Sequence, residues 1–389
     1  MPECDNPLWP CAMTGAAACL AGFKGITVVI HGSSGCYYYP STLLHSPLEG
    51  TFITENEVIF GSEERLCEVI DELAGTGLRI AVVNTCVPSL LGEDIRSMLA
   101  SRDVLFVDSP GFSGDVEKGY RTALDILDPA INPENRGVNI DGVTIFDPFY
   151  RGNVQEIRRL LRMASVPVGT VFCADSLANV KNAAPYTIGT NADFSGSTGE
   201  YLGGTLGFEE IRRTFGTIGD TFENADVDPV LKESEHEEER AITACDKFLR
   251  RHEPPRVAIF GGLSYALFAA KTLERYLDTD IVCIGARNDP GPVSWGTSAG
   301  NVAHVQGMKA VKERICRHRP DLVIGSSFEQ SVERSAGFIG IVPPMRDKVR
   351  LAPHMIAGCG GTLSFIENVL NECMDKKKRS REFYEESVS

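Results

Sequence analysis

The feature that most constrains the fold is a short apolar run that leads into a glycine-rich turn. Residues 26–30 read Ile-Thr-Val-Val-Ile, and residues 31–36 continue as His-Gly-Ser-Ser-Gly-Cys. A continuous apolar and β-branched run of this length is typical of a strand buried on both faces, as in a parallel sheet. Open sheets of this kind bind their ligands beyond the carboxyl ends of the strands. Cys36 therefore stands where such a sheet would hold a ligand, although buried cysteines are more often inert.

The same alternation of strand and helix patterns continues along the chain. Further strands are predicted over residues 78–83, 104–107, 143–146, 168–172, 256–260, 281–284 and 322–324. Helices are predicted over residues 63–73, 90–100, 154–163, 265–276 and 362–373. Strands that alternate with amphipathic helices predict βαβ units and parallel, doubly wound sheets. The predicted fold class is therefore α/β, with three Rossmann-like domains built on parallel sheets.

Two breaks in composition set the predicted domain boundaries. A passage rich in Pro and Asn at residues 128–135 closes the first α/β domain. A charged helical connector follows the second domain and ends on Glu-Pro-Pro at residues 253–255. The domains are therefore predicted at residues 1–136, 137–232 and 255–389, with the connector at residues 233–254.

Two further stretches have no clear helix or strand pattern. Residues 186–207 are rich in Gly, Ser and Thr, and form either a substrate-facing loop or a flexible crossing. The basic run at residues 376–379 near the C-terminus is predicted to be disordered.

Composition excludes several classes of function. The chain is 43% hydrophobic and 23% charged, as in ordinary globular proteins, and its net charge of −15 argues against nucleic-acid binding. No apolar run approaches the ~20 residues of a membrane span, and the N-terminus lacks the basic segment of a signal peptide. We therefore expect a cytoplasmic protein with no membrane partner. In a reducing compartment its 12 cysteines indicate metal binding, catalysis or burial before disulfides.

Three cysteines stand where ligands of a metal cluster are expected. Cys86 follows the strand predicted over residues 78–83, as Cys36 follows its own strand. If the two strands are neighbours, both carboxyl ends open on the same edge of the sheet. Cys11 precedes a run of small residues that predicts a closely packed helix, whereas Cys19 and Cys173 are expected to be buried. Since a 4Fe–4S cluster takes four thiolates, three per chain favour a cluster shared across a subunit interface.

The motifs around these cysteines match those of a known family in order and spacing. They are Cys-x-x-x-Gly-Ala-x-x-Cys from Cys11, His-Gly-Ser-Ser-Gly-Cys ending at Cys36, and Thr-Cys-x-x-x-Leu-x-Gly-Glu-Asp around Cys86. Further segments that resemble the family lie at residues 54–61, 108–114, 321–325 and 360–371. Over nearly its whole length the chain resembles component 1 of nitrogenase and the nitrogenase-like reductases that act on tetrapyrroles.

The resemblance implies a function and a set of site residues. It implies an oxidoreductase whose domains pair as a homodimer or with a paralogous subunit, and which receives electrons from a separate ATP-hydrolysing iron protein. Cys11, Cys36 and Cys86 would hold an iron–sulfur cluster, either 4Fe–4S or a larger eight-iron cluster, with Ser33 and Ser113 as nearby donors. The ATP would bind to the partner, because this chain has no Gly-x-x-x-x-Gly-Lys-[Ser/Thr] loop. The Gly-Gly turn at residues 261–262 is explained better by close packing than by a dinucleotide.

The chain also departs from nitrogenase at the site of the large metal cofactor. The family holds that cofactor with a Cys in the second domain and a His in the third. The matching residues 183–191 contain no cysteine, whereas His354 falls near the histidine position. Dinitrogen reduction is therefore not expected, and His354 is a candidate catalytic residue, with packing and ligand roles also open. Other candidates for lining a substrate cavity are Tyr37, Tyr38, His45 and Trp295.

Two functions remain from the sequence, beside the plain alternative of an α/β protein with buried cysteines. The first is the catalytic component of a nitrogenase-like reductase, with a tetrapyrrole as the expected substrate. The second is a scaffold on which a metal cluster is assembled and handed on without turnover. A reductase needs a cavity for a planar ligand and a docking face, whereas a scaffold needs an open cluster site.

Overall fold

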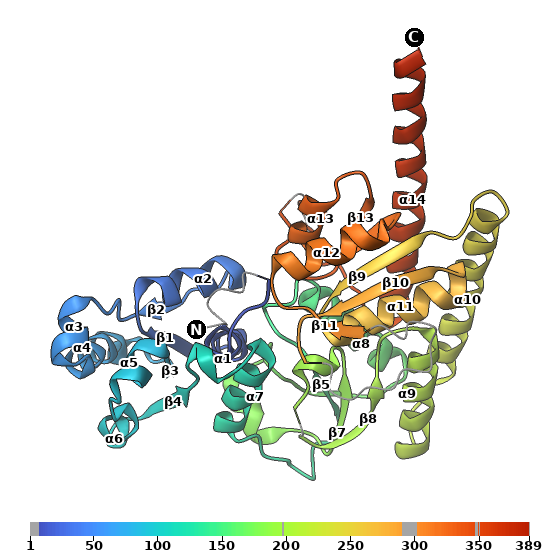
Figure 1. The fold of residues 1–389 in the computed structure, drawn as a ribbon. Helices are drawn as coiled ribbons and strands as arrows, with labels where there is room; N and C mark the ends of the chain where they lie inside the picture. Colours follow the sequence, from blue (N-terminus) through green and yellow to red (C-terminus); the bar gives the residue numbers. More distant parts are fainter. Residues whose placement is uncertain (1–7, 197, 290–301, 347–348, 350, 389) are drawn as a thin grey trace. The chain divides into compact units, whose positions relative to one another are not determined.

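The computed structural model describes residues 8–196, 198–289, 302–346, 349 and 351–388, with side chains up to residue 375. Three sheets are present, and their strands alternate with helices along the chain (Figure 1). The predicted α/β class with parallel sheets is therefore confirmed. Among the described helices, none combines the length and the apolar character that a membrane crossing requires. Trp295, predicted to line a cavity, lies outside the described residues.

The first sheet has four parallel strands in the order β2-β1-β3-β4. These strands are β1 (Ile26–His31), β2 (Glu49–Gly50), β3 (Arg79–Asn84) and β4 (Val104–Asp108). The helices around them are α1 (Ala12–Gly22), α2 (Ser34–Leu44), α3 (Glu55–Phe60), α4 (Glu63–Leu73), α5 (Cys86–Leu91), α6 (Ile95–Leu99) and α7 (Val116–Leu127), with short 3₁₀ turns η1 (Ala74–Thr76) and η2 (Gly111–Ser113). An apolar core between β1, β3, α4 and α6 includes Val29, Leu66, Val82 and Ile95.

The second sheet has four strands in the order β6-β5-β7-β8, with β5 and β6 parallel. Its strands are β5 (Val138–Asp141), β6 (Val168–Val171), β7 (Tyr186–Gly189) and β8 (Glu200–Gly204). The helices of this part are α8 (Tyr150–Met163), η3 (Leu177–Asn182), η4 (Ala192–Phe194) and α9 (Phe208–Thr221). The stretch at residues 186–207 therefore contains two strands and is not one long loop.

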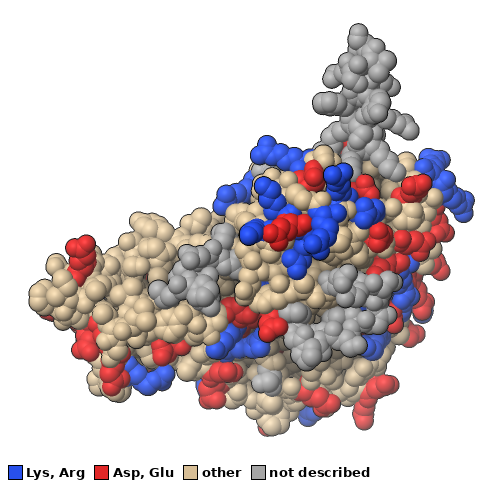
Figure 2. All heavy atoms as spheres, viewed as in Figure 1, with Lys and Arg blue, Asp and Glu red and all other residues tan. Residues whose placement is uncertain are grey.

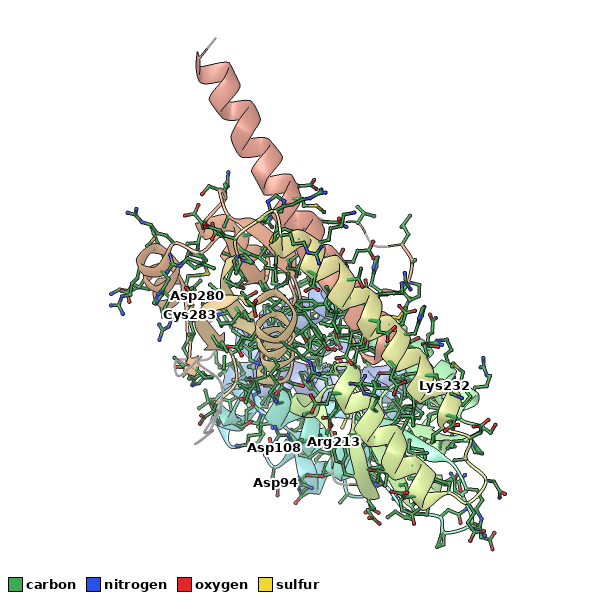
Figure 3. All side chains as sticks on the ribbon, turned by 90° about the vertical axis from the view of Figure 1, so that its right-hand side faces the viewer. Asp94, Asp108, Arg213, Lys232, Asp280 and Cys283 are labelled. Atoms are coloured by element: carbon green, nitrogen blue, oxygen red, sulfur yellow. The ribbon has the colours of Figure 1, made fainter. Side chains whose placement is uncertain are left out.

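The third sheet has five parallel strands in the order β11-β10-β9-β12-β13. The strands are β9 (Arg256–Gly261), β10 (Asp280–Ala286), β11 (Val302–His304), β12 (Leu322–Gly325) and β13 (Gly337–Gly340). Its helices are α10 (Asp228–Leu249), α11 (Leu263–Leu277), α12 (Met308–His318), α13 (Ser327–Val332) and α14 (Gly358–Val388). Helix α10 packs against both α9 and α14 (Figure 3).

By its internal contacts the chain forms two compact units. The first consists of residues 1–147, 168–187 and 194–201, and the second of residues 148–167, 188–193 and 202–389. The first unit contains the whole of the first sheet, and the second contains the whole of the third. The three-domain boundaries predicted from the sequence remain a prediction.

Three of the predicted elements are wrong. The helix expected over residues 90–100 is two short helices, because Gly92 in the left-handed conformation ends α5. The strand expected over residues 143–146 is instead β5, residues 138–141, where Asn139 and Asp141 interrupt the apolar pattern. The basic tail expected to be disordered continues α14 as a helix to Val388.

The polar residues of β5 are buried because their hydrogen bonds are satisfied. Asn139 Oδ1 accepts from the backbone N–H groups of Thr170 and Ala184, and its amide donates to the Ala184 carbonyl. Asp141 accepts from the N–H groups of Gly142 and Gly196. A buried polar strand is therefore stable here, although its composition does not resemble a strand.

Candidate functional site

Cys36 and Cys86 follow two neighbouring parallel strands, as the sequence predicts. The last pair in register between β1 and β3 is His31 with Asn84. Cys86 is the first residue of α5, and Cys36 lies in the first turn of α2. Both cysteines therefore leave the same edge of the first sheet.

Cys11 and Cys86 converge on a third element at this edge, the turn that contains Gly111. A Cβ atom built on Gly111 would lie 3.1 Å from Cys86 Sγ and 3.2 Å from Cys11 Sγ. The backbone N–H of Gly111 also donates to Cys86 Sγ at 3.1 Å. The two sulfur atoms therefore flank one point, and the absent side chain of Gly111 leaves the space between them open.

Close packing of α1 against α7 puts Cys11 in place. A Cβ on Gly15 would lie 1.8 Å from the Val116 carbonyl oxygen, and one on Gly119 would lie 1.7 Å from that of Ala12. The two helices therefore approach backbone to backbone, which only glycine permits. Cys11 is the N-cap of α1, and the N–H of Ala12 donates to the Gly114 carbonyl at 2.9 Å. The closely packed helix predicted from the run of small residues is confirmed.

Burial dominates the electrostatics of Cys11. It raises the pKa of the thiol, while hydrogen bonds from Thr14 and Met13 oppose this and the neighbouring Cys86 adds to it. Burial therefore favours the neutral thiol of Cys11, and a bound cation would stabilise its thiolate.

Cys36 and the two predicted serines lie near this edge, without a contact to the other two sulfurs. Cys36 is half-buried, and Ser33 Oγ donates to its sulfur at 3.7 Å. Ser113 lies in η2 and is half-buried, and its carbonyl accepts from Lys118 Nζ. Within the described ranges, no three His, Cys, Asp or Glu side chains are gathered to hold a single metal ion. The structure thus brings Cys11 and Cys86 together, and the role of Cys36 as a third ligand stays a prediction.

The elements that carry or adjoin the cysteine edge also expose large apolar side chains, a feature that the sequence analysis missed. Phe60 is 84% exposed, and Ile59 and Leu90 are 70% and 63% exposed. The other members are Tyr38, Tyr39, Val58, Leu91 and Phe112, and together the eight form the apolar rim of this site. Helix α2 contributes no charged residue, and the surface over it is tan in Figure 2. Exposed patches of this kind mark interaction surfaces.

Gly111 was also missed, although a signal for it exists in the sequence. It follows β4, the next strand of the same parallel sheet, within Asp-Ser-Pro-Gly at residues 108–111. Three neighbouring strands therefore end at one edge of the sheet, whereas the prediction from the sequence considered only two of them.

The buried cysteines are as predicted. Cys19 and Cys173 are both fully buried, and their sulfur atoms lie 3.4 Å apart. Tyr120 Oη lies 3.0 Å from Cys173 Sγ and donates to the Val143 carbonyl at 2.9 Å. These groups form a satisfied core network.

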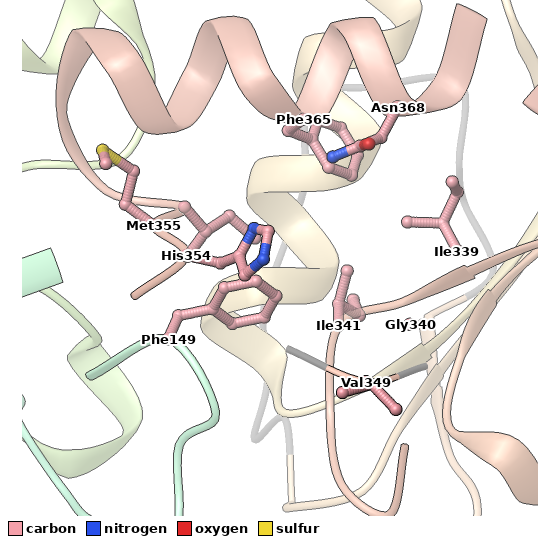
Figure 4. A pocket seen from close by; sticks show the side chains of 10 residues that line it. Phe149, Ile339, Gly340, Ile341, Val349, His354, Met355, Phe365 and Asn368 are labelled. Carbon is pink, nitrogen blue, oxygen red and sulfur yellow. The ribbon is translucent and has the colours of Figure 1, made fainter. Parts of the chain in front are cut away.

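His354 lies at a pocket of about 310 Å³ within the second unit. Figure 4 shows its imidazole beside the ring of Phe149, with Phe365 and Asn368 projecting from α14. The other lining residues are Ile339, Gly340, Ile341, Val349, Met355 and Ile356. Apolar walls with a few polar groups are typical of a small-molecule site. His354 therefore lines a cavity of the second unit, and its role in a reaction stays a prediction.

Side chains of α8 fix the backbone that carries His354. Asn153 Oδ1 accepts from the N–H groups of Ile356 and Ala357 at 2.9 and 3.0 Å. Gly152 is so close that a Cβ there would lie 2.0 Å from the His354 carbonyl oxygen. The segment before α14 is therefore held rigidly, and His354 projects from a fixed backbone.

The turn at residues 261–262 is not arranged to bind a phosphate. At the N-terminus of α11, Asp193 accepts from the N–H of Ser264, and Asn288 accepts from that of Leu263. A carboxylate of the chain itself thus occupies the place where a dinucleotide phosphate would bind.

Of the other predicted lining residues, Tyr37 has packing contacts and His45 is exposed. Tyr37 donates to the Leu48 carbonyl and its ring contacts Phe52. His45 ends α2 in the left-handed conformation.

Comparison with known proteins gives one family and several relatives. A model of the nitrogenase component 1 type oxidoreductases matches residues 11–374. A nitrogenase iron-molybdenum cofactor biosynthesis protein NifE from Clostridium pasteurianum is 23% identical, over 92% of this chain and 86% of its own length. A nitrogenase molybdenum-iron protein beta chain from Sinorhizobium fredii is 30% identical over 41% of this chain and 36% of its own. A solved structure described as nitrogenase Cp1 at pH 6.5 has the same fold, with a TM-score of 0.80 and 16% identity over 96% of this chain and 94% of that one.

Proposed function

The chain belongs to the nitrogenase component 1 type oxidoreductases, and from this we propose that it is the cluster-bearing component of a nitrogenase-like reductase. Cys11, Cys36 and Cys86 hold an iron–sulfur cluster at a subunit interface. A separate ATP-hydrolysing iron protein supplies the electrons, and a bound tetrapyrrole, not dinitrogen, is the substrate class that we propose to test.

The observation that carries this proposal is the convergence of Cys11 and Cys86 on Gly111. Thiolates are the ligands that iron–sulfur clusters take, and the missing Cβ of Gly111 leaves space between the two sulfurs. The hydroxyls of Thr85 and Ser109 are buried nearby in sequence without a hydrogen-bond partner. Such buried polar atoms call for a partner, which a water molecule or a bound group can supply. The residues present therefore fit a cluster.

The apolar rim supports the partners in this proposal. A Phe side chain that is 84% exposed is costly for a monomer, and covering the rim would remove apolar surface from water. We assign part of the rim to a second subunit, identical or paralogous, whose cysteines complete the ligand set. The remainder, at the ends of α3 and α5, is assigned to the iron protein.

The chain's own residues hold and shield the site. The Gly111 N–H stabilises negative charge on Cys86 Sγ, and Ser33 Oγ donates to Cys36. The glycine contacts between α1 and α7 keep Cys11 from moving away. When bound, the cluster supplies storage and transfer of single electrons.

A second candidate function is a scaffold for building a metal cofactor. The NifE relative matches 92% of this chain, and the name of that relative describes cofactor biosynthesis. In this role the chain would bind a cluster and pass it to an acceptor protein without turnover. His354, on its rigid backbone at the pocket, would then be a cofactor-facing residue, and its substitution would reduce transfer more than binding.

The first experiment measures iron, sulfide and the EPR signal of the anaerobically purified, dithionite-reduced protein. About four irons per dimer and a reduced-cluster signal support the electron-relay function, whereas about eight or more favour a larger cluster or assembly. Cys36→Ala should lose the signal, and Cys67→Ala should keep it, because Cys67 is a half-buried cysteine of the same unit that contacts Met98. No iron after anaerobic reconstitution would refute both functions.

A second experiment separates the two functions. The loaded protein is mixed with iron protein, ATP and a tetrapyrrole, and separately with an apo-acceptor protein. ATP-dependent substrate reduction supports the reductase. Iron transfer to the acceptor without reduction supports the scaffold.

A further inference from the structure

A buried chain of hydrogen bonds runs beside the cysteine edge of the first unit. Glu93 accepts from the N–H of Ser62 at 2.6 Å and from its hydroxyl. Ser62 Oγ lies 3.0 Å from His31 Nε2, and His31 Nδ1 lies 3.2 Å from Thr51 Oγ1. Thr51 Oγ1 in turn accepts from the N–H of Gly32 at 3.0 Å. His31, Thr51 and Ser62 are fully buried, and the Glu93 side chain is 8% exposed.

The chain has one consistent direction of donation. The Glu93 carboxylate can only accept, so the Ser62 hydroxyl donates its hydrogen bond to Glu93. The Ser62 oxygen then accepts from Nε2–H of His31, and Nδ1 of His31 accepts from the Thr51 hydroxyl. Burial, opposed by Glu93, lowers the pKa of His31 to about 4, so the ring is neutral at pH 7. His31 is therefore held as the Nε2–H tautomer.

This direction excludes a hydrolytic role. A serine nucleophile gives its proton to a histidine and faces a substrate. The Ser62 hydroxyl instead donates its hydrogen bond to Glu93, and the Ser62 side chain has no exposure to solvent. The network therefore holds backbone segments in place.

The segments that it holds belong to two different surfaces. Ser62 lies two residues after Phe60 and Glu93 two residues after Leu91, so the outer end lies beneath the apolar rim at α3 and α5. The inner end is Gly32, where a Cβ would lie 2.1 Å from Thr85 Oγ1. Gly32 begins the turn that leads to Cys36, and the residue after Thr85 is Cys86. The hydrogen-bond chain thus joins the exposed apolar ends to the turn of Cys36, and the packing of Gly32 against Thr85 connects that turn to the turn of Cys86.

We propose that Glu93 is a positioning residue that, through Ser62 and His31, fixes the ends of α3 and α5 relative to the turns carrying Cys36 and Cys86. The proposal rests on the function proposed above, since that function makes these turns cluster ligands and this rim a docking surface. A partner that binds to the apolar rim then meets a surface that is already aligned with the turns carrying Cys36 and Cys86. Preorganisation of this kind favours binding because the two segments do not have to lose conformational freedom when the partner binds.

The first test uses the apo-protein and reads the tautomer of His31. In Glu93→Gln the new amide donates to Ser62 Oγ, so the Ser62 hydroxyl turns to His31 Nε2. His31 must then change to the Nδ1–H tautomer, which ¹⁵N chemical shifts of labelled histidine report. The signal is assigned by its loss in His31→Gln, and Glu64→Gln serves as the control because Glu64 is an exposed carboxylate nearby. An unchanged Nε2–H tautomer in Glu93→Gln would overturn the proposal.

The second test uses the loaded protein with its iron protein and ATP. In Glu93→Gln we expect wild-type iron content, while the iron-protein concentration for half-maximal electron transfer rises about five-fold or more. Glu64→Gln should match the wild type in both. A Glu93→Gln protein that switches tautomer yet keeps the wild-type half-saturating concentration would refute the positioning role. If the wild-type chain binds no iron, the proposed function fails, while the tautomer measurement still decides whether Glu93 directs the hydrogen-bond chain.

Discussion

Gly111→Ala is the substitution that tests the cluster site most directly. The added methyl group would lie 3.1 Å from Cys86 Sγ and 3.2 Å from Cys11 Sγ, closer than an ordinary carbon–sulfur contact. The φ of Gly111 is not in the left-handed region, so the backbone tolerates alanine and the cost comes from crowding alone. In the apo-protein the two thiols can move apart by rotating. In the loaded protein both sulfurs are fixed by their bonds to iron and cannot move.

The expected effect is therefore on the cluster and not on the fold. Overpacking costs about 1–3 kcal/mol, which corresponds to a loss of about 5- to 150-fold in cluster affinity. The apo-protein should lose less than about 1 kcal/mol of unfolding free energy, because an unstrained Gly→Ala change reduces the entropy of the unfolded chain. The loss should appear as a lower iron content after anaerobic reconstitution and as faster removal of iron by a chelator.

A matched control is Gly35→Ala in the first turn of α2. A Cβ at Gly35 meets only Ser33 Oγ at 3.9 Å, so the same chemical change is made beside Cys36 without crowding a sulfur. This variant should reconstitute like the wild type. If Gly111→Ala also keeps full iron content and wild-type resistance to the chelator, Cys11 and Cys86 do not hold a common cluster around Gly111.

Three further predictions concern stability. In Gly119→Ala the new Cβ would lie 1.7 Å from a backbone oxygen of α1, so unfolding in urea should show a loss of more than about 3 kcal/mol; a near-wild-type midpoint would contradict the close approach of α1 and α7. Glu329→Gln leaves Arg287 buried without its ionic partner and should cost about 3–5 kcal/mol, while replacing both by apolar residues should cost less in the same assay. Burial raises the pKa of Asp141 from 3.8 to about 6. The buried, protonated Asp141 therefore contributes fully to stability below pH 3.8, and this contribution is lost as the pH rises through 6. The expected loss of unfolding free energy is about 3 kcal/mol relative to Asp141→Asn. A difference in unfolding free energy between the two proteins that does not change with pH would refute this.

The sequence was sufficient for the alternation of elements and for one edge of the first sheet. Runs of apolar and β-branched residues, five at residues 26–30 and four at residues 80–83, predict β1 and β3 because a strand buried on both faces is apolar at nearly every position. Once the two strands are neighbours, the position of Cys36 and Cys86 at one edge follows from geometry. The same rule fails for β5, where Asn139 and Asp141 are buried with their hydrogen bonds supplied by segments about 30 to 55 residues away. A local pattern carries no information about such distant partners.

The contacts around the cysteines depend on three-dimensional convergence and were beyond a reading of local patterns. The ends of α1 and α5 and the turn after β4 meet at Gly111. Because Gly111 has no Cβ atom, the space between the sulfurs of Cys11 and Cys86 stays open. Glu93 was visible only as part of a motif. Its role depends on Ser62, which is 31 residues earlier, and on the direction of each hydrogen bond between them.

The rigidity of the cysteine edge bears on the choice between a resident and a transferable cluster. A cluster that is handed on requires ligands that can withdraw, whereas an electron relay benefits from ligands that stay fixed. Cys86 is only 7% exposed and accepts the Gly111 N–H, and Cys11 begins a helix that is locked backbone to backbone onto α7. The Cys11 side chain can rotate, but moving its backbone away from the site would require α1 to separate from α7 and expose buried apolar surface, so withdrawal beyond a side-chain rotation is costly. On this ground the geometry favours a resident cluster, and with it the reductase over the scaffold.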